Sequence, residues 1–463
     1  MGADSIAKRR ILFFNWAPFD HAGGWGGGVT VYLRNLLDVL SRRDDLEIFF
    51  LSSGTDYSRF RRGVRLVPSE NVFSDRGVKS FVIVNSPVRA PARQMFHEMD
   101  TWRKDQHSAD LVRGLLKDHG PFDAVHIHNL EGISSAVLEL RPEFPQTRFF
   151  YTWHNYIPLC PQVHLLFQDR QDCQDYGDGA RCVGCVEQRG EAGWSPVNYD
   201  TAVQPGSLAF DPRPGLSALA AGYRGWRETN IDLFNQVIDG SIAVSRTVKE
   251  TIVPLGIEAD TITVLPPGMD VHKTHAEMKA AWAAKSGHDA FTFSFIGYGD
   301  PAKGLPFMAD ALEMAASKAL KAKADLIVVA RLTDQERRNL LRLENAFRKV
   351  TYIHGHTRDQ LAEIAALSDV NIVPSIWRET YNQVAYEMLC MGTPCMLSSS
   401  VGLGMFYTGK EDFLFEAGQH RQLVAKMEAL VCAPEKMAAF WDVPVELPSM
   451  EEHADGLLAV LLG

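Results

Sequence analysis

The sequence lacks any long hydrophobic run. No stretch approaches the ~18 to 20 consecutive apolar residues that a membrane-spanning helix needs. The apolar stretch behind the charged first residues, Ile11 to Phe14, is also too short for the core of a signal peptide. Low-complexity tracts and internal repeats are missing as well. These absences predict a folded cytoplasmic protein and leave open only peripheral contact with a membrane.

Two nucleotide-binding fingerprints are missing too. The chain contains neither Gly-x-Gly-x-x-Gly nor the longer glycine loop that ends in Gly-Lys-Ser or Gly-Lys-Thr. The first brings glycine backbone close to a pyrophosphate, and the second wraps a phosphate in backbone N–H groups. Their absence argues against a dinucleotide-dependent oxidoreductase and against a phosphate-loop nucleotidase.

Basic residues are fewer than acidic residues. Lys and Arg number 47 against 57 Asp and Glu, which gives a net charge of −10. We therefore expect no nucleic-acid partner, because proteins that coat nucleic acid carry the opposite sign. Basic residues still gather in one short stretch, at Arg59, Arg61, Arg62 and Arg65. Such a cluster is typical of a solvated face, and a patch for a membrane surface or an anionic acceptor is the alternative.

The length of 463 residues exceeds what one hydrophobic core normally supports. A buried strand, a glycine-rich loop and a helix with apolar spacing follow one another over residues 10–40, and a second strand comes next. The second half repeats this alternation from residue 291. The pattern predicts an α/β protein with two doubly wound, Rossmann-like domains at 1–268 and 269–440, followed by a segment at 441–463 that packs back on the first domain.

An irregular insertion is predicted at about 160–214, where the apolar residues follow neither the spacing of a helix nor that of a strand. It holds four of the seven cysteines: Cys160, Cys173, Cys182 and Cys185. The last two have the two-residue spacing that lets both thiolates face one metal ion, and four soft ligands suit tetrahedral zinc. His164 or Asp172 could replace one ligand. A structural zinc site and four reduced thiols both remain open.

The most informative stretch runs from Pro374 to Pro394. Glu379 follows the carboxyl end of a predicted buried strand, where open α/β sheets bind ligands. The residues after it, Thr380 to Gln383, begin a helix whose free N–H groups favour phosphate. Glu387 lies eight residues further on, about 12 Å along a helix axis, so it would reach another part of one extended ligand. The alternative is that Glu379 caps the helix and Glu387 is an ordinary surface residue.

This stretch resembles the donor motif of retaining glycosyltransferases with the GT-B fold, the large family four of that classification. The resemblance rests on the two glutamates, the Gly392-Thr-Pro394 that follows them, and the strand ending in Pro374-Ser375. Ile296-Gly297 to Lys303-Gly304 is similar to the strand and Lys-Gly turn of the family. Gly26-Gly27-Gly28 looks like its N-domain glycine loop. The similarity extends over nearly the whole chain and implies two facing domains with a closing C-terminal helix.

The resemblance also implies roles for single residues in a nucleotide-sugar site. Glu379 would bind hydroxyls of the donor sugar, Glu387 the ribose, and Lys303 the leaving diphosphate. Backbone at Gly27 and Gly28 would approach the diphosphate, and N–H groups of Tyr381 and Asn382 would hold phosphate or sugar oxygens. His128 resembles the histidine that faces the transferred sugar. His126 would lie deeper in the strand, and His154 is a second candidate.

The implied reaction is transfer of a hexose or N-acetylhexosamine from a UDP- or GDP-sugar with retention at the anomeric carbon, in glycan or glycoconjugate biosynthesis. No catalytic metal is expected, since no Asp-x-Asp pair is present. The acceptor could be a glycan, a lipid-linked sugar or a protein. An epimerase of the same fold and a non-catalytic nucleotide- or partner-binding lobe are the alternatives. Tyr298 stands where the family usually has arginine, and Arg331 or Arg378 could replace that charge.

Overall fold

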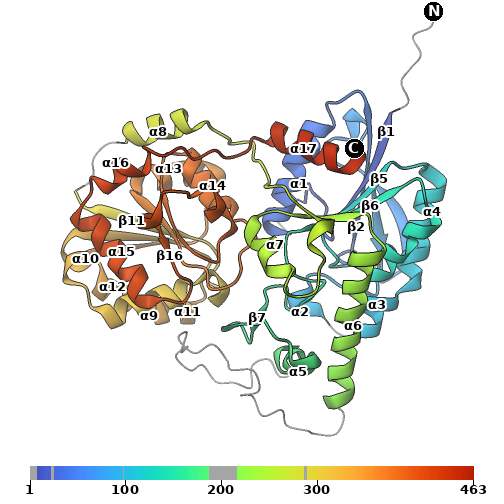
Figure 1. The fold of residues 1–463 in the computed structure, drawn as a ribbon, viewed down its shortest axis with the longest axis horizontal. Coiled ribbons are helices and arrows are strands. Elements are labelled where there is room, and N and C mark those ends of the chain that lie inside the picture. The colour runs from blue at the N-terminus through green and yellow to red at the C-terminus, as the bar shows by residue number, and fades with distance from the viewer. Residues whose placement is uncertain (1–7, 22–25, 97, 187–215, 286–288) are drawn as a thin grey trace, which may run out of the picture.

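The structure is a computed structural model that describes residues 8–21, 26–96, 98–186, 216–285 and 289–463. Two α/β domains lie side by side along the long axis of the molecule (Figure 1). Each domain is built around its own mainly parallel sheet. The predicted fold class is therefore confirmed.

The N-terminal domain contains an eight-stranded sheet in the order β10-β9-β6-β5-β1-β2-β4-β3. All neighbours pair in parallel except β3 and β4. Its strands are β1 (Arg9–Phe14), β2 (Leu46–Ser53), β3 (Arg65–Ser69), β4 (Lys79–Val84), β5 (Ala124–Ile127), β6 (Arg148–Trp153), β9 (Gly240–Ala243) and β10 (Ile262–Val264). The run Ile11 to Phe14 in β1 is at most 3% exposed, as expected for a strand covered by helices on both faces.

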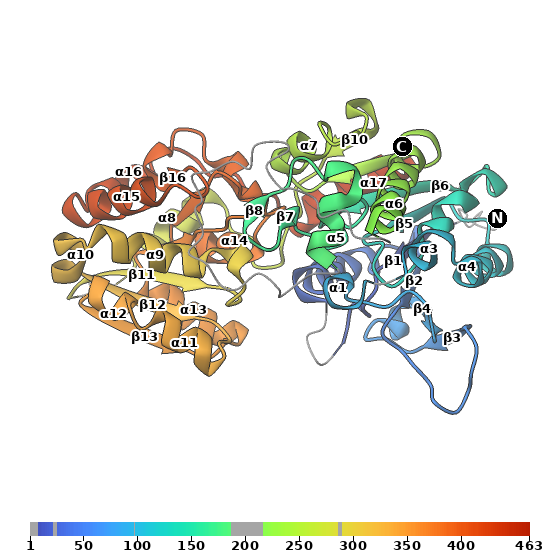
Figure 2. The ribbon, with the colours of Figure 1, turned by 90° about the horizontal axis from the view of Figure 1, so that it is seen from below.

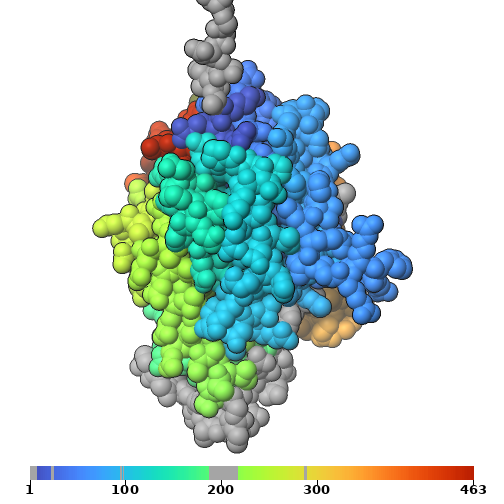
Figure 3. Space-filling view, turned by 90° about the vertical axis from the view of Figure 1, so that its right-hand side faces the viewer, coloured from blue at the N-terminus to red at the C-terminus, as the bar shows by residue number. Residues whose placement is uncertain are grey.

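Helices cover this sheet on both sides (Figures 1 and 2). They are α1 (Gly27–Leu40), α2 (Ala92–Met95), α3 (Met99–Lys104), α4 (Gln106–His119), α6 (Leu216–Gln236) and α7 (Arg246–Ile252), with a 3-10 segment at Ser135–Glu143. The loop between β2 and β3 projects from the domain, and it forms the blue bulge at the right of Figure 3. The sequence pattern did not predict β3, an antiparallel edge strand that contains Pro68.

The insertion contains more regular structure than its composition indicated. A hairpin of β7 (Leu166–Phe167) and β8 (Gln171–Asp172) is followed by the short helix α5 (Ala180–Val186). Its remainder lies outside the described residues. In Figure 2 the hairpin lies between the two domains, and α5 packs on α6.

The C-terminal domain contains a six-stranded sheet in the order β13-β12-β11-β14-β15-β16. The strands are β11 (Phe291–Ile296), β12 (Ala324–Val329), β13 (Lys349–Ile353), β14 (Val370–Val373), β15 (Cys395–Ser398) and β16 (Leu414–Phe415). The helices are α8 (His275–Ala283), α9 (Leu305–Ala315), α10 (Lys318–Lys323), α11 (Asp334–Leu340), α12 (Leu343–Ala346), α13 (Arg358–Leu367), α14 (Gln383–Cys390), α15 (His420–Cys432) and α16 (Lys436–Phe440).

The last helix, α17 (Met450–Leu462), returns to the N-terminal domain and packs against α1. Its apolar side, with Leu457 and Leu461, belongs to the same core as Leu33 and Leu37 of α1. The hydroxyl of Tyr32 lies 2.8 Å from Nε2 of His453, so a buried hydrogen bond also joins the two helices. Among the described helices, none is both long and apolar enough to cross a membrane.

Candidate functional site

Each sheet has one point where the chain reverses the order in which it adds strands. In the N-terminal domain this point lies between β1 and β5, and in the C-terminal domain it lies between β11 and β14. Open α/β sheets bind ligands in the crevice outside the carboxyl ends of the strands at such points. The segment that follows β14 contacts the N-terminal domain directly: Thr380 Oγ1 donates to the carbonyl of His154 at 3.0 Å, and Gln383 Nε2 donates to that of Gly28 at 2.8 Å. The two crevices therefore face each other.

Glu379 is held by a dense set of donors after β14. One carboxylate oxygen forms an ion pair with Lys303 and accepts from Asn382 Nδ2 at 2.9 Å, and the other accepts from the hydroxyl of Ser375. Burial acts to raise the pKa of Glu379, but Lys303 and the hydrogen bonds bring it below its usual range. The side chain is therefore ionised, buried and fixed in position.

Lys303 comes from the turn that follows β11, in the 3-10 segment Pro301–Lys303. Gly304 ends this turn with φ of 79°, and a Cβ there would lie 1.7 Å from the carbonyl oxygen of Pro374. Only glycine permits so close an approach. This contact brings the turn after β11 against the end of β14, so Lys303 and Glu379 meet although they are 76 residues apart.

The start of α14 presents backbone donors beside this pair. Asn382 is the N-cap residue, and its side chain accepts from the N–H of Ala385 at 2.8 Å. Among the described residues, the N–H groups of Tyr381, Asn382 and Gln383 have no hydrogen-bond partner. Free N–H groups at a helix start favour an anion.

The glycine loop of the N-terminal domain faces α14. Gly27 and Gly28 are the first residues of α1, and a Cβ at Gly28 would lie 2.9 Å from Oε1 of Gln383. Gly28 therefore lies where the two domains touch. Residues 22–25 of the predicted loop lie outside the described residues.

Glu387 lies further along α14, near a second pair of charges. Arg358 forms an ion pair with Asp270 at 2.6 Å, and both charges act on Glu387. Burial is the larger effect and raises the pKa of Glu387 to about 7. Its position is thus not that of an ordinary exposed residue. A cavity of about 910 Å³ between the domains is lined by Asp270, Arg358 and Gly27.

Three histidines of the N-terminal domain, His126, His128 and His154, form one cluster. His128 follows β5, and its Nδ1 lies 3.0 Å from Nε2 of His154. His126 pairs through Nε2 with the hydroxyl of Thr152 at 2.7 Å. Burial lowers the pKa of all three imidazoles, that of His154 to about 3. They are therefore neutral at physiological pH, and Nε2 of His128 has no hydrogen-bond partner among the described residues.

Arg93 of α2 lies across the cleft. Its guanidinium pairs with Asp169 at the tip of the β7–β8 hairpin at 2.9 Å and also with Asp300 in the turn that carries Lys303. His164 lies near this group. Burial and the charges of Arg93 and Lys303 lower its pKa to about 4. Its ring contacts that of Trp377 with centroids 4.5 Å apart. No local sequence pattern marks Arg93, since both partners are distant in the chain.

The candidate replacements for the missing arginine lie elsewhere. Arg378 forms a bidentate pair with Asp172 of the hairpin, at 2.7 and 2.9 Å. The side chain of Arg331 packs beside Gly355. Tyr298 is 61% exposed in the turn after β11. Among Arg93, Arg331 and Arg378, Arg93 is the residue whose guanidinium forms an ion pair with the turn that holds Lys303.

The four cysteines of the insertion come near one another. Burial raises the pKa of Cys182, and negative charge on Cys160, Cys173 or Cys185 would raise it further. The N–H of Gln168 points to Sγ of Cys185 at 3.2 Å. Within the described ranges, however, no group of three or more His, Cys, Asp or Glu side chains has the arrangement of a metal site.

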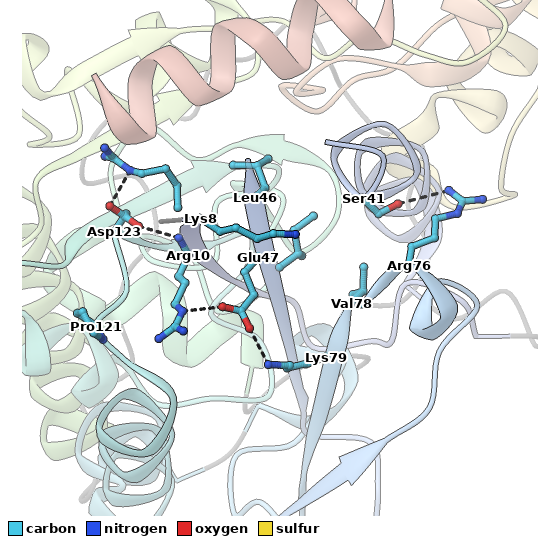
Figure 4. Close-up of a pocket in the computed structure, with 13 residues that line it drawn as sticks. Lys8, Arg10, Ser41, Leu46, Glu47, Arg76, Val78, Lys79, Pro121 and Asp123 are labelled. Atoms are coloured by element: carbon cyan, nitrogen blue, oxygen red, sulfur yellow. Dashed lines mark hydrogen bonds and ion pairs between the residues drawn. The ribbon is translucent and has the colours of Figure 1, made fainter. Parts of the chain in front are cut away.

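Another cavity, of about 780 Å³, lies at the opposite edge of the first sheet (Figure 4). It is lined by residues at the amino ends of β1, β2 and β4. Both of its carboxylates are already paired: Glu47 accepts from Arg10 and from Lys79, each at 2.6 Å, and Asp123 accepts from the N–H of Arg10. The amino ends of parallel strands are also not where these sheets bind ligands. This cavity is therefore not the candidate site.

Comparison with known proteins concerns the C-terminal domain and the overall fold. Residues 290–432 match the family model described as glycosyl transferases group 1. No curated protein sequence matches the chain. Sucrose-phosphate synthase from Thermosynechococcus elongatus is similar in structure, with a TM-score of 0.58 and 16% identity over 98% of this chain and 96% of that chain.

Two further solved structures have the same architecture. The E. coli trehalose-6-phosphate structure bound with UDP-2-fluoro glucose has a TM-score of 0.58 and 13% identity, over 98% of this chain and 99% of that chain. Anabaena Alr3699/HepE in complex with UDP and glucose has a TM-score of 0.55 and 14% identity, over 97% and 98%. The chain therefore has the GT-B fold, and its C-terminal domain matches the group 1 glycosyltransferases.

Proposed function

We propose that this protein is a glycosyltransferase that moves a hexosyl or N-acetylhexosaminyl group from a UDP- or GDP-sugar to an acceptor, with retention at the anomeric carbon. The observation that carries the proposal is the buried, ionised Glu379 paired with Lys303 beside the free N–H groups of α14. A carboxylate that accepts sugar hydroxyls and a cation for the diphosphate are the two groups that such a donor requires. The match of residues 290–432 to the group 1 glycosyltransferases adds independent support.

Donor binding would separate Lys303 from Glu379, with Lys303 binding the diphosphate and Glu379 binding the sugar hydroxyls. Ser375 and Asn382 also donate hydrogen bonds to the carboxylate, so Glu379 keeps its place when Lys303 turns towards phosphate. The N–H groups of Tyr381 and Asn382 would bind phosphate or sugar oxygens. Glu387, two turns along α14, would accept from the ribose hydroxyls, while Gly27 and Gly28 allow the opposite domain to approach the diphosphate.

In the transfer step, the bond between the anomeric carbon and the diphosphate oxygen breaks, and its electron pair stays on that oxygen. The acceptor hydroxyl forms the new bond on the same face, and its proton passes to the departing phosphate. No protein nucleophile is needed. The protein would act by stabilising the negative charge that develops on the leaving group, and His128 would contact the transferred sugar through its unpartnered Nε2.

Arg93 would supply the second positive charge for the diphosphate. In the structure it pairs with Asp300, three residues before Lys303, and with Asp169 of the hairpin. The diphosphate would compete with these carboxylates for a guanidinium that can bind two oxygens at once. Arg93 would then take the place of the arginine that Tyr298 replaces, from the opposite domain.

A structural zinc ion in the insertion is a separate proposal. Cys160, Cys173, Cys182 and Cys185 come from three segments of chain and gather beside α5, and metal binding would draw their sulfurs into a tetrahedron. The Gln168 N–H that points to Cys185 is the kind of donor that stabilises a bound thiolate. The ion would fix the hairpin that carries Asp169 and Asp172.

A screen for nucleotide release tests the proposed reaction. UDP-, GDP- and ADP-sugars are offered with candidate acceptors, and the anomeric configuration of the product is read by NMR. We expect release from one class of donor, and a loss of about 100-fold in kcat for Glu379→Gln, because the transferred sugar loses a charged acceptor. The exposed Glu363→Gln on α13 is the matched control. Normal turnover by Glu379→Gln would exclude this site, and an inverted product would exclude the retaining mechanism.

A further inference from the structure

The loop between β2 and β3, residues 54–64, projects from the N-terminal domain (Figures 2 and 3). Phe60 is 98% exposed, more than any other large hydrophobic residue of the described chain, and Tyr57 is 48% exposed. A phenylalanine left almost wholly in water forgoes the stabilisation that burial would give. A single exposed hydrophobic residue is common on a protein surface, so the meaning of Phe60 depends on the groups that surround it.

The charges around Phe60 have one sign. Between residues 54 and 65 the chain has a single acid, Asp56, and four arginines, Arg59, Arg61, Arg62 and Arg65. Within the described residues, none of these four arginines forms an ion pair. By contrast, Arg42, Arg43, Arg76, Arg113 and Arg141 all pair with carboxylates. The loop is therefore an unneutralised basic patch on a protein whose net charge is −10.

The loop is also held in a defined shape. Asn85 accepts from the N–H of Ser58 at 2.7 Å, and its amide donates to the carbonyls of Arg61 and Gly63 at 2.7 and 3.0 Å. The hydroxyl of Tyr57 donates to the carbonyl of Ser86 at 3.1 Å. Phe60 is thus presented outward by a loop that is fixed at both sides, and little ordering cost would attend its binding.

We propose that this loop docks the protein on an anionic lipid bilayer, with Phe60 inserted at the headgroup level and the arginines on lipid phosphates. An aromatic ring between cations suits the interface of a bilayer, where one group enters the acyl boundary and the others meet negative charge. An acidic polysaccharide would use the arginines but would offer no apolar phase for Phe60. The loop lies on the N-terminal domain, so docking leaves the C-terminal domain free. This proposal does not depend on the proposed reaction.

Flotation of the full chain with lipid vesicles tests the docking surface. The vesicles contain phosphatidylcholine alone or phosphatidylcholine mixed with phosphatidylglycerol. We expect binding only with phosphatidylglycerol, and Phe60→Ser should lower the partition coefficient about tenfold, since an inserted aromatic ring is lost. The variant Arg59→Gln/Arg61→Gln/Arg62→Gln should weaken binding by about fivefold for each charge.

The matched control removes three exposed cations of the C-terminal domain, in Arg337→Gln/Arg338→Gln/Lys349→Gln, and should bind as the unaltered protein does. Circular dichroism shows that each variant is folded. Equal binding to both kinds of vesicle, or equal weakening by the control, would overturn the proposal. Binding to dextran sulfate that Phe60→Ser leaves unchanged, without binding to vesicles, would overturn it in favour of an acidic glycan.

Discussion

Single side chains in the cleft have properties that their neighbours impose. Glu379 and Glu387 are the same residue type on one segment, yet Lys303 and two further hydrogen-bonding groups lower the pKa of the first despite its burial, and burial raises that of the second to about 7. The difference arises because only Glu379 has a cation in direct contact. The two carboxylates should therefore respond differently to pH.

Nucleotide binding should depend on the ionisation of Glu387. Its carboxyl is half protonated near pH 7 and is a stronger hydrogen-bond acceptor when ionised, so affinity for the nucleoside diphosphate should rise with pH through that value and then level off. Below about pH 7 the affinity should rise by up to about tenfold per pH unit. Calorimetric titration between about pH 6 and pH 8 measures it. Glu387→Gln should abolish the slope, whereas Glu363→Gln should retain it; a slope that survives in Glu387→Gln would contradict the assignment.

Arg93 and Asp169 should have opposite effects on diphosphate affinity. Arg93→Gln should weaken binding of the nucleoside diphosphate about tenfold and leave the monophosphate little changed, because a charge-assisted contact to the second phosphate is lost. Asp169→Asn should strengthen binding, since it removes one competitor for the guanidinium. Calorimetry on both variants and on the double variant measures this coupling.

The Arg89→Gln variant is the control for Arg93, since Arg89 lies over the ring of Tyr57 and away from the cleft pair. If Tyr298→Arg restored binding to Arg93→Gln, the replacement of the missing arginine would be supported directly. Unchanged affinity in Arg93→Gln would refute the role. Failure of the unaltered protein to bind any nucleoside diphosphate would refute the proposed function instead.

At the level of elements, the β7–β8 hairpin connects the insertion to both domains. Its tip residue Asp169 contacts Arg93, and Asp172 holds Arg378, so the hairpin spans the cleft. Two strands of two residues each are marginal by themselves. Contacts outside the hairpin therefore stabilise it: its two ion pairs and the packing of Leu166 in the hydrophobic core. A zinc ion held by the cysteines of the insertion would add to them.

Metal analysis of the purified protein should find about one zinc per chain, because structural sites hold zinc tightly. Cobalt substitution should give the intense visible absorption of thiolate-bound tetrahedral cobalt. Cys182→Ser should lower the metal content and the melting temperature, while Cys432→Ser, at an exposed position, should change neither. Less than ~0.3 equivalents of metal in fresh protein would end the zinc proposal.

For the whole molecule, the return of α17 to the N-terminal domain brings a fourth histidine to the histidine cluster. His126 lies in β5, His128 and His154 follow β5 and β6, and His453 of α17 joins them through Tyr32. Burial lowers the pKa of each imidazole, to about 3 for His154 and about 4 for His453. The folded protein therefore binds these protons less readily than the unfolded chain.

Acid should destabilise the protein through this cluster. The unfolded chain takes up the protons below its histidine pKa of about 6.5, so the free energy of unfolding should fall as pH drops from there towards the folded values, by roughly 1.4 kcal/mol per unit and per histidine. Urea unfolding at about pH 7 and pH 5 measures the loss. His453→Gln should show a shallower dependence than the exposed His107→Gln. Equal stability at both pH values would contradict the assignment.

Much of the architecture could be predicted from local pattern. The alternation of buried strands and amphipathic helices indicated two α/β domains, and β11 and β14 were expected within a residue of where they lie. Strand β3 could not be predicted, because an edge strand with one exposed face and a proline has no clear period. The juxtaposition of Lys303 and Glu379 was expected from family resemblance rather than from spacing. The roles assigned to those residues remain predictions.

The sequence by itself determined the main strands and helices of both sheets, because hydrophobic period and glycine position act within a few residues. It also placed glycine at 304 and glutamate at 379. Only the tertiary structure decided that Arg93 reaches Asp300 across the cleft, that His453 meets Tyr32, and that Phe60 stands in water. The two contacts join residues hundreds of positions apart, and the exposure of Phe60 arises because no other segment covers it. They are set by how distant segments pack in space, which no local pattern encodes.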